Sequence, residues 1–202
     1  MSLLIDPPFA LGQTLGVSST ADGVGWVGAV KQFPDVNPLT GTVRSNRIKT
    51  CVAVRNVATI ALVPKRTVVF STTAGLPGLS SVTGYTAATN TEHVGVVDEY
   101  LPAAGVAVND VFWVTVDGPT EVLASHVVAT IAAGDRIAAQ TAAASTGTTA
   151  GRVGPSLLSS ATTAAGDNSR GVIGYALSAG TTAASTGLTA AYTPLCLIST
   201  RY

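Results

Sequence analysis

The chain has 202 residues, and its 11 Lys and Arg balance its 11 Asp and Glu to a formal net charge of zero. This length suits one domain with a hydrophobic core plus an arm, or two small lobes. Charged residues make up 11% of the chain, well below the share in ordinary soluble domains, and the mean hydropathy is +0.43. No window holds about twenty continuous apolar residues, so the sequence excludes a transmembrane helix and we expect no membrane partner.

The charges are unevenly distributed along the chain. Residues 1–66 carry seven basic and three acidic side chains, a net charge of +4, whereas residues 67–202 carry four basic and eight acidic ones, a net charge of −4. Almost no side chain in the sequence is typical of catalysis. The charge split therefore predicts a protein that fits onto other protein surfaces, with its own copies as one candidate partner.

Residues 1–48 are predicted to form an extended, irregular N-terminal arm. Four Pro and six Gly interrupt any helix or long strand in this segment. Its large apolar side chains are too widely spaced to build a core of their own, so we expect them to become buried against a partner. These side chains are Leu3, Leu4, Ile5, Phe9, Trp26 and Phe33. The first residues lack the basic start of a signal peptide, which favours synthesis and use in a cytosol.

A glycine motif lies inside this arm. Residues 23–28 read Gly-Val-Gly-Trp-Val-Gly and match the dinucleotide-binding pattern literally. That pattern requires a buried strand before it and a helix after it. No strand-like run precedes residue 23, and Pro34 would end a following helix within two turns. We therefore expect no cofactor, and we interpret Trp26 as an anchor for an apolar pocket.

A basic cluster follows the arm, with six cations and no acid across residues 44–66. It is compatible with a nucleic-acid site, with contact to an acidic protein surface, or with a solvated face. Protein contact is favoured, since strands would project the charges from a folded sheet and no aromatic side chain interleaves Arg44, Arg47 and Lys49. We expect no nucleic-acid partner. The candidate contact residues of arm and cluster together are Leu4, Phe9, Trp26, Phe33, Arg44, Arg47, Lys49, Arg55, Lys65 and Arg66.

Residues 49–202 have the texture of an all-β protein. Short β-branched runs alternate with turn residues, which predicts a small β-sandwich or barrel-like domain. The predicted strands are 51–54, 58–63, 67–70, 94–97, 111–116, 127–131, 136–139, 172–177 and 195–198. Similar motifs recur around residues 95–105 and 171–180, so two related β subunits, about 49–125 and 126–202, are one interpretation. The Ala/Thr/Ser/Gly tracts at 140–151 and 178–191 are predicted loops or hairpin tips.

Few side chains in the sequence suggest chemistry. Asp98 and Glu99 are the only adjacent carboxylates; neighbours in a strand face opposite ways, and in a turn we expect both to be solvated. His126 follows a serine, but no nucleophile elbow surrounds that serine. We therefore expect no catalytic residue and no enzyme, which argues against a hydrolase.

The two cysteines are interpreted as small buried hydrophobes. Cys51 and Cys196 lie in apolar runs far apart in sequence, and a disulfide between them stays open for an oxidising setting. Together with His93 and His126 they show none of the spacings typical of zinc sites, so no metal is expected.

Several stretches resemble phage head decoration (cement) proteins. They are residues 38–47 (PLTGTVRSNR), 51–56 (CVAVRN), 62–66 (LVPKR), 132–138 (AAGDRIA), 151–153 (GRV) and 171–177 (GVIGYAL), so that the resemblance spans about residues 38–198. The resemblance implies a β domain that binds the outside of an icosahedral capsid as a dimer or trimer and locks neighbouring major capsid proteins together. It implies a virion protein on the capsid exterior, assembled in the host cytoplasm, without catalytic site, cofactor or small-molecule substrate.

One alternative stays open from the sequence. A fibre or adhesin-like β binding module that recognises glycans would need an exposed aromatic platform. The aromatic residues available for one in the β region are Tyr85, Tyr100, Trp113, Tyr175 and Tyr192.

Overall fold

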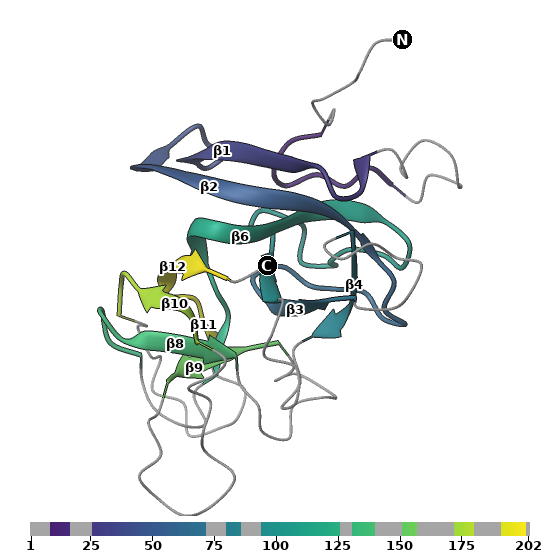
Figure 1. The fold of residues 1–202 in the computed structure, drawn as a ribbon. Helices are drawn as coiled ribbons and strands as arrows, with labels where there is room; N and C mark the ends of the chain where they lie inside the picture. The colour runs from purple at the N-terminus through teal and green to yellow at the C-terminus, as the bar shows by residue number, and fades with distance from the viewer. Residues whose placement is uncertain are drawn as a thin grey trace, which may run out of the picture.

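The computed structural model describes residues 9–16, 26–71, 80–85, 94–125, 131–139, 151–156, 172–179 and 191–200. These ranges contain twelve strands and no helix, which confirms the predicted all-β fold (Figure 1). Within them, no helix is long and apolar enough to cross a membrane. The strands are β1 (Val30–Val36), β2 (Val43–Asn56), β3 (Thr67–Phe70), β4 (Ser81–Tyr85), β5 (Val94–Val97), β6 (Val111–Glu121), β7 (Ala124–Ser125), β8 (Arg136–Ala139), β9 (Val153–Pro155), β10 (Val172–Ala176), β11 (Ala191–Tyr192) and β12 (Leu195–Ser199).

Five strands close into a first barrel, barrel 1. Strand β2 pairs in parallel with β4, the antiparallel series β4, β3, β5 and β6 follows, and β6 pairs back with β2. Because side chains alternate along a strand, Val52 and Val54 of β2 point into the barrel while Cys51 and Ala53 point out of it. The buried interior consists of Val52, Val54, Ala58, Leu62, Val68, Phe70, Val82, Val97, Leu101, Val106, Phe112, Val114 and Val116.

A second ring, barrel 2, starts from the other half of β6. From β6 the pairing runs through β12, β10, β8 and β9 and returns to β7, which follows β6 after two residues. Its buried core is built from smaller side chains, and it includes two residues of β5 from barrel 1. These core residues are Val94, Val96, Val122, Ala124, Ile131, Ile137, Val153, Ile173, Ala176, Cys196 and Ile198.

The two barrels have the same strand order. In each, the first strand pairs in parallel with the third and antiparallel with the fifth, while the second strand pairs with the third and the fourth. Strand β6 is the last strand of barrel 1 and, continued by β7, the first of barrel 2. Strand β6 changes from pairing with β2 to pairing with β12 at Asp117 and Gly118, and Asp117 lies opposite both Thr50 of β2 and Ser199 of β12. Gly118 has a φ of +101°, and a Cβ there would lie 2.5 Å from the Ile48 carbonyl oxygen, so only glycine fits.

The described part of residues 1–48 corrects the prediction of an irregular arm that needs a partner. Strand β1 pairs antiparallel with β2 from Val30 opposite Val52 to Val36 opposite Val43, and the expected boundary at residue 48 lies within β2. Phe9 stacks on Trp113 with ring centroids 4.6 Å apart. This contact could not be predicted from the sequence. Trp113 is on the outward face of barrel 1, and the residue that buries it, Phe9, lies about a hundred positions away in the chain. Leu3, Leu4 and Ile5 lie outside the described residues.

The predicted strand at 58–63 is also wrong, apart from a single bridge between Leu62 and Val106. The side chain of Asn56 takes over the backbone hydrogen bonds at this point. Its amide nitrogen donates to the carbonyls of Ile60 and Val106 at 3.1 and 3.0 Å, and its Oδ1 accepts from the Ala58 amide at 3.0 Å. The buried asparagine therefore turns the chain where the β-branched residues predicted a strand. Most of the expected strand at 127–131 lies outside the described residues.

Candidate functional site

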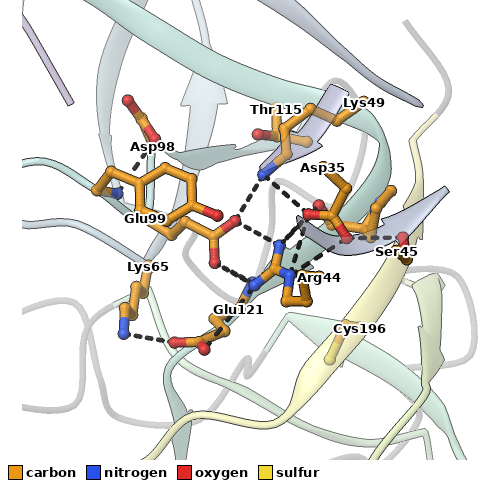
Figure 2. A network of polar contacts seen from close by, with 12 residues as sticks. Asp35, Arg44, Ser45, Lys49, Lys65, Asp98, Glu99, Thr115, Glu121 and Cys196 are labelled. Atoms are coloured by element: carbon orange, nitrogen blue, oxygen red, sulfur yellow. Dashed lines mark hydrogen bonds and ion pairs between the residues drawn. The ribbon is translucent and has the colours of Figure 1, made fainter. Parts of the chain in front are cut away.

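Three acidic and three basic side chains from distant parts of the chain meet near the turn end of the β1–β2 hairpin (Figure 2). They come from the hairpin, from the segment before β3, from the turn after β5 and from the end of β6. We call them the ion-pair cluster: Asp35, Arg44, Lys49, Lys65, Glu99 and Glu121. Its three positive and three negative side chains balance.

Arg44 is the centre of this cluster. Its Nη1 and Nη2 donate to the two carboxylate oxygens of Glu99, each at 2.8 Å. Its Nε and Nη2 donate to Oδ1 of Asp35 at 3.0 and 2.6 Å. The planar guanidinium thus joins two buried carboxylates with paired hydrogen bonds, a geometry that lysine cannot provide.

Lys49 is one of the largest fully buried side chains of the described residues, with 1% of its surface exposed. Its Nζ donates to Oε1 of Glu99 at 2.6 Å and lies 3.8 Å from Oδ1 of Asp35. It also lies 5.0 Å from the centre of the Tyr100 ring, over which a cation is favoured. The carboxylates around it offset the cost of burying an ammonium group.

Glu121 forms the outer edge of the cluster. Its carboxylate accepts a hydrogen bond from Lys65 Nζ at 2.5 Å and lies 3.8 Å from Nη1 of Arg44, while its backbone amide donates to Glu99 at 3.0 Å. Both Lys65 and Glu121 keep about a third of their side-chain surface in contact with solvent. This pair therefore contributes less than the buried core of the cluster.

The environment shifts the pKa values of the buried acids in opposite directions. Burial alone would raise the pKa values of Asp35 and Glu99, but the hydrogen bonds and charges of Arg44 and Lys49 outweigh it and hold both pKa values below their usual range. Asp98 is buried without a basic hydrogen-bond partner in the described residues. Burial raises its pKa to about 6, although the amides of Gly12 and Tyr100 donate to its carboxylate at 2.5 and 3.2 Å.

These contacts correct the expectation that Asp98 and Glu99 are solvated, since their exposed fractions are 1% and 6%. Glu99 points into the ion-pair cluster and Asp98 holds the segment that begins at Phe9. Sequence reasoning missed Asp35, Glu99 and Glu121 as partners of the basic cluster. The signal was present, because a basic half and an acidic half of one chain complement each other as well as they complement a foreign surface.

The cluster is suited to rigidity rather than to chemistry. Each guanidinium nitrogen of Arg44 hydrogen-bonds a carboxylate, and the Asp35 carboxylate also accepts from Ser45 Oγ at 2.7 Å. A saturated, neutral network of this kind fixes the β1–β2 hairpin against β6 and the turn after β5. It leaves no nucleophile or open base at its centre.

Around this cluster, the hairpin exposes large apolar side chains. Leu39 in its turn is 79% exposed, Val43 60%, and Val30 and Ile48 56% each. Ile48 lies opposite Pro34 on the neighbouring strand, so these two apolar residues are adjacent on the hairpin. We call Val30, Leu39, Val43 and Ile48 the hairpin surface. Further exposed apolar residues of the described ranges, Ile60, Val108, Tyr175 and Leu177, lie on other elements.

The candidate contact residues from the sequence fall into four groups. Arg44, Lys49 and Lys65 pair with acids of the same chain, so they are not available to a partner as free charges. Phe9 is buried, and Phe33 meets the edge of Trp113 with ring centroids 5.2 Å apart. Arg55, Arg66 and Trp26 are half-buried, with Arg66 lying over the Tyr85 ring, and Arg47 is exposed on the hairpin. Leu4 lies outside the described residues.

The cysteines are as the sequence predicted. Cys51 and Cys196 are both free and buried, and burial raises the pKa of each thiol to about 12. Among the described residues, no three His, Cys, Asp or Glu side chains are grouped so that they could hold a metal ion. His93 and His126 are outside those residues.

Because comparisons with known proteins found no match, a function has to be inferred from the fold and from these contacts. No protein-family model, no curated protein and no solved structure matches this chain.

Proposed function

We propose that this chain is a structural virion protein that binds the outer surface of an icosahedral phage capsid and stabilises contacts between major capsid proteins. The observation that carries the proposal is the hairpin surface: four exposed apolar side chains, Leu39 at 79% among them, presented by a hairpin that the ion-pair cluster holds rigid. Large apolar side chains gathered on one exposed element are favourable for protein contact, and rigidity lowers the entropy cost of binding. The resemblance of residues 38–47 to decoration proteins falls on the same hairpin.

The structure revises which residues would make this contact. The arm and the basic cluster were the predicted surface, but most of their side chains serve the chain's own packing. The contact we propose uses the hairpin surface with Arg47 as an exposed cation beside it. Self-association into a dimer or trimer on the capsid is part of the same proposal, because a repeated surface suits a symmetric shell.

The test uses shells assembled from the major capsid protein encoded with this chain. The purified chain is mixed with shells, and a density gradient separates bound from free protein. We expect the wild type to migrate with the shells and to raise their melting temperature. The double variant Leu39→Asp with Val43→Asp should bind at least about 100-fold more weakly, since two apolar side chains lose their burial. Ile60→Asp, at an exposed position away from the hairpin, is the matched control.

Two results would overturn the proposal: wild-type protein that stays free at saturating concentration, or a double variant that binds as well as the Ile60→Asp control. Circular dichroism of each variant shows that folding is unchanged.

The glycan-binding alternative has one observation in its favour. Tyr175 on β10 is 46% exposed, and aromatic faces bind sugars. A glycan array with wild type and Tyr175→Ala separates the two functions, because capsid binding through the hairpin does not involve Tyr175.

A further inference from the structure

Arg152 differs from the cations of the ion-pair cluster, because it is buried and no carboxylate of the described residues pairs with it. Its exposed fraction is 4%, and its Nε and Nη1 atoms are buried with no hydrogen-bond partner in the part of the chain that the structure describes. No ion pair within the described ranges includes it, whereas Arg44 reaches three acids and Lys49 reaches two. A buried guanidinium stays protonated, so its charge and its donors need a partner.

Arg152 lies at the seam between the two barrels. The carbonyl oxygen of the preceding residue, Gly151, accepts hydrogen bonds from the backbone amide and the Oγ1 of Thr67 in β3, at 2.7 and 3.0 Å. The amide of the following residue, Val153, donates to the carbonyl of Leu123 at 3.0 Å. Contacts on both sides therefore fix the backbone of Arg152 between β3 of barrel 1 and β7 of barrel 2.

A second arginine reaches the same seam. Arg66 directly precedes Thr67, and its guanidinium carbon lies 5.1 Å from the centre of the Tyr85 ring. Gly151 packs against the same ring: a Cβ on Gly151 would lie 2.7 Å from Cδ1 of Tyr85. Burial, together with the positive charge of Arg66, lowers the pKa of Arg152. The positive charge of Arg66 therefore acts on Arg152 at this seam.

We propose that Arg152 binds an oxyanion, phosphate or carboxylate, at the seam of the two barrels. The fork of N–H groups on a guanidinium matches two oxygens of such an anion. The anion would satisfy the two buried donors of Arg152 and compensate its buried charge. This site is remote in sequence from the hairpin surface and does not depend on capsid binding.

The test is the melting temperature of the full chain in chloride buffer, with sodium phosphate or sodium acetate replacing chloride at constant ionic strength. We expect one of these oxyanions to raise the melting temperature by about 3–6 °C when it exceeds its dissociation constant tenfold. A response to phosphate identifies a tetrahedral oxyanion as the ligand, and a response to acetate alone identifies a carboxylate.

Variants separate binding from general stabilisation by salt. Arg152→Met keeps the aliphatic packing and removes the unpaired charge, so it should melt at or above the wild-type temperature in chloride and lose the oxyanion response. Arg152→Lys keeps a charge without the fork and should bind about tenfold more weakly. Arg47→Met, at an exposed position, is the control and should respond as the wild type does.

Three results would overturn the site: equal melting temperatures in chloride and both oxyanions, an oxyanion response that survives in Arg152→Met, or a large loss of stability of Arg152→Met in chloride. The last would mean that the chain itself already satisfies the arginine.

Discussion

The two barrels share one strand order but differ in how they are stabilised. Barrel 1 contains the large buried side chains Phe70 and Phe112, and its outer face is covered by Phe9 and Phe33 on Trp113. Barrel 2 is built from Val, Ile, Ala and Cys, and the strands that belong to it alone have two to five residues. The same pairing pattern therefore tolerates different packing. The cover on barrel 1, made by residues before β2, is the main difference between them.

Deleting residues 1–36 would test this cover most severely. The deletion removes β1, takes both phenylalanine partners from Trp113 and takes Asp35 from Arg44 and Lys49. A lost aromatic contact and an uncompensated buried cation each cost several kcal/mol, so we expect a loss of about 5 kcal/mol or more in the free energy of unfolding. Circular dichroism and urea denaturation would show a protein without a cooperative transition.

Deletion of residues 1–8 is the control, because it leaves the described contacts of Phe9 in place. If the 1–36 deletion unfolds at nearly the wild-type urea concentration, these residues do not stabilise the barrels, as the predicted separate arm would require.

The variant Glu99→Gln tests the ion-pair cluster, which joins the β1–β2 hairpin to the turn after β5. The variant leaves Arg44 and Lys49 buried with one carboxylate fewer, which should cost about 3–5 kcal/mol of stability. The matched change at the edge of the cluster is Lys65→Met, which should cost about 0–1 kcal/mol, since solvent reaches both members of that pair. Urea denaturation of the two variants gives the comparison. Equal losses would show that the cluster does not hold the hairpin rigid.

The pH dependence of stability follows from the two kinds of buried acid in barrel 1. The folded-state pKa of Asp98 is raised from 3.8 to about 6, so its protonated form favours folding and stability falls as the pH rises from about 4 to 6. The pKa values of Asp35 and Glu99 are lowered, so their contribution is present above their unfolded values and is lost as the pH falls below about 4.

We therefore expect maximum stability near pH 4–5, with a decrease of about 2–3 kcal/mol toward pH 7. In Asp98→Asn the decrease between pH 4 and pH 6 should disappear. Urea midpoints measured across this pH range provide the check, and a wild-type profile that rises through pH 6 would contradict the assignment to Asp98.

The smallest expected difference between the barrels is in the rate at which each unfolds locally. Cys51 lies under the cover of barrel 1, and Cys196 lies in the core of barrel 2. Both thiols are fully buried, with 0% exposure, so each reacts with a thiol reagent only when its surroundings open. In single-cysteine variants, Cys51→Ala and Cys196→Ala, we expect Cys196 to react about tenfold faster than Cys51, because short strands open more readily. Equal rates would show that the shared strand β6 makes the barrels open as one unit.

Much of the strand content could be predicted from local pattern. The runs 67–70 and 94–97 match β3 and β5, and the run at 136–139 matches β8, because buried strands of β-branched residues are readable by themselves. Strands β1 and β4 were missed, since Pro34 and Gly84 interrupt them. Strand β1 accommodates Pro34 because it is at the edge of the sheet, where one fewer backbone donor is tolerated.

The candidate site was predictable in composition but not in place. The cations Arg44 and Lys49 were singled out as a surface, and the structure turns them inward onto Asp35 and Glu99. A charge run in sequence carries no information about which acids fold back onto it. That depends on the hairpin register and on the turn after β5, which bring residues 55 positions apart to within 2.8 Å.

The sequence by itself determined the all-β class of the protein, because strand-forming side chains and turn residues act locally. It also determined that the two cysteines are buried, since both lie in apolar runs. Only the tertiary structure decided that β6 serves two barrels, that Trp113 is covered by Phe9, and that the opposite charges of the two halves neutralise each other. These are contacts between residues far apart in the chain, and their energy depends on distances that no local pattern specifies.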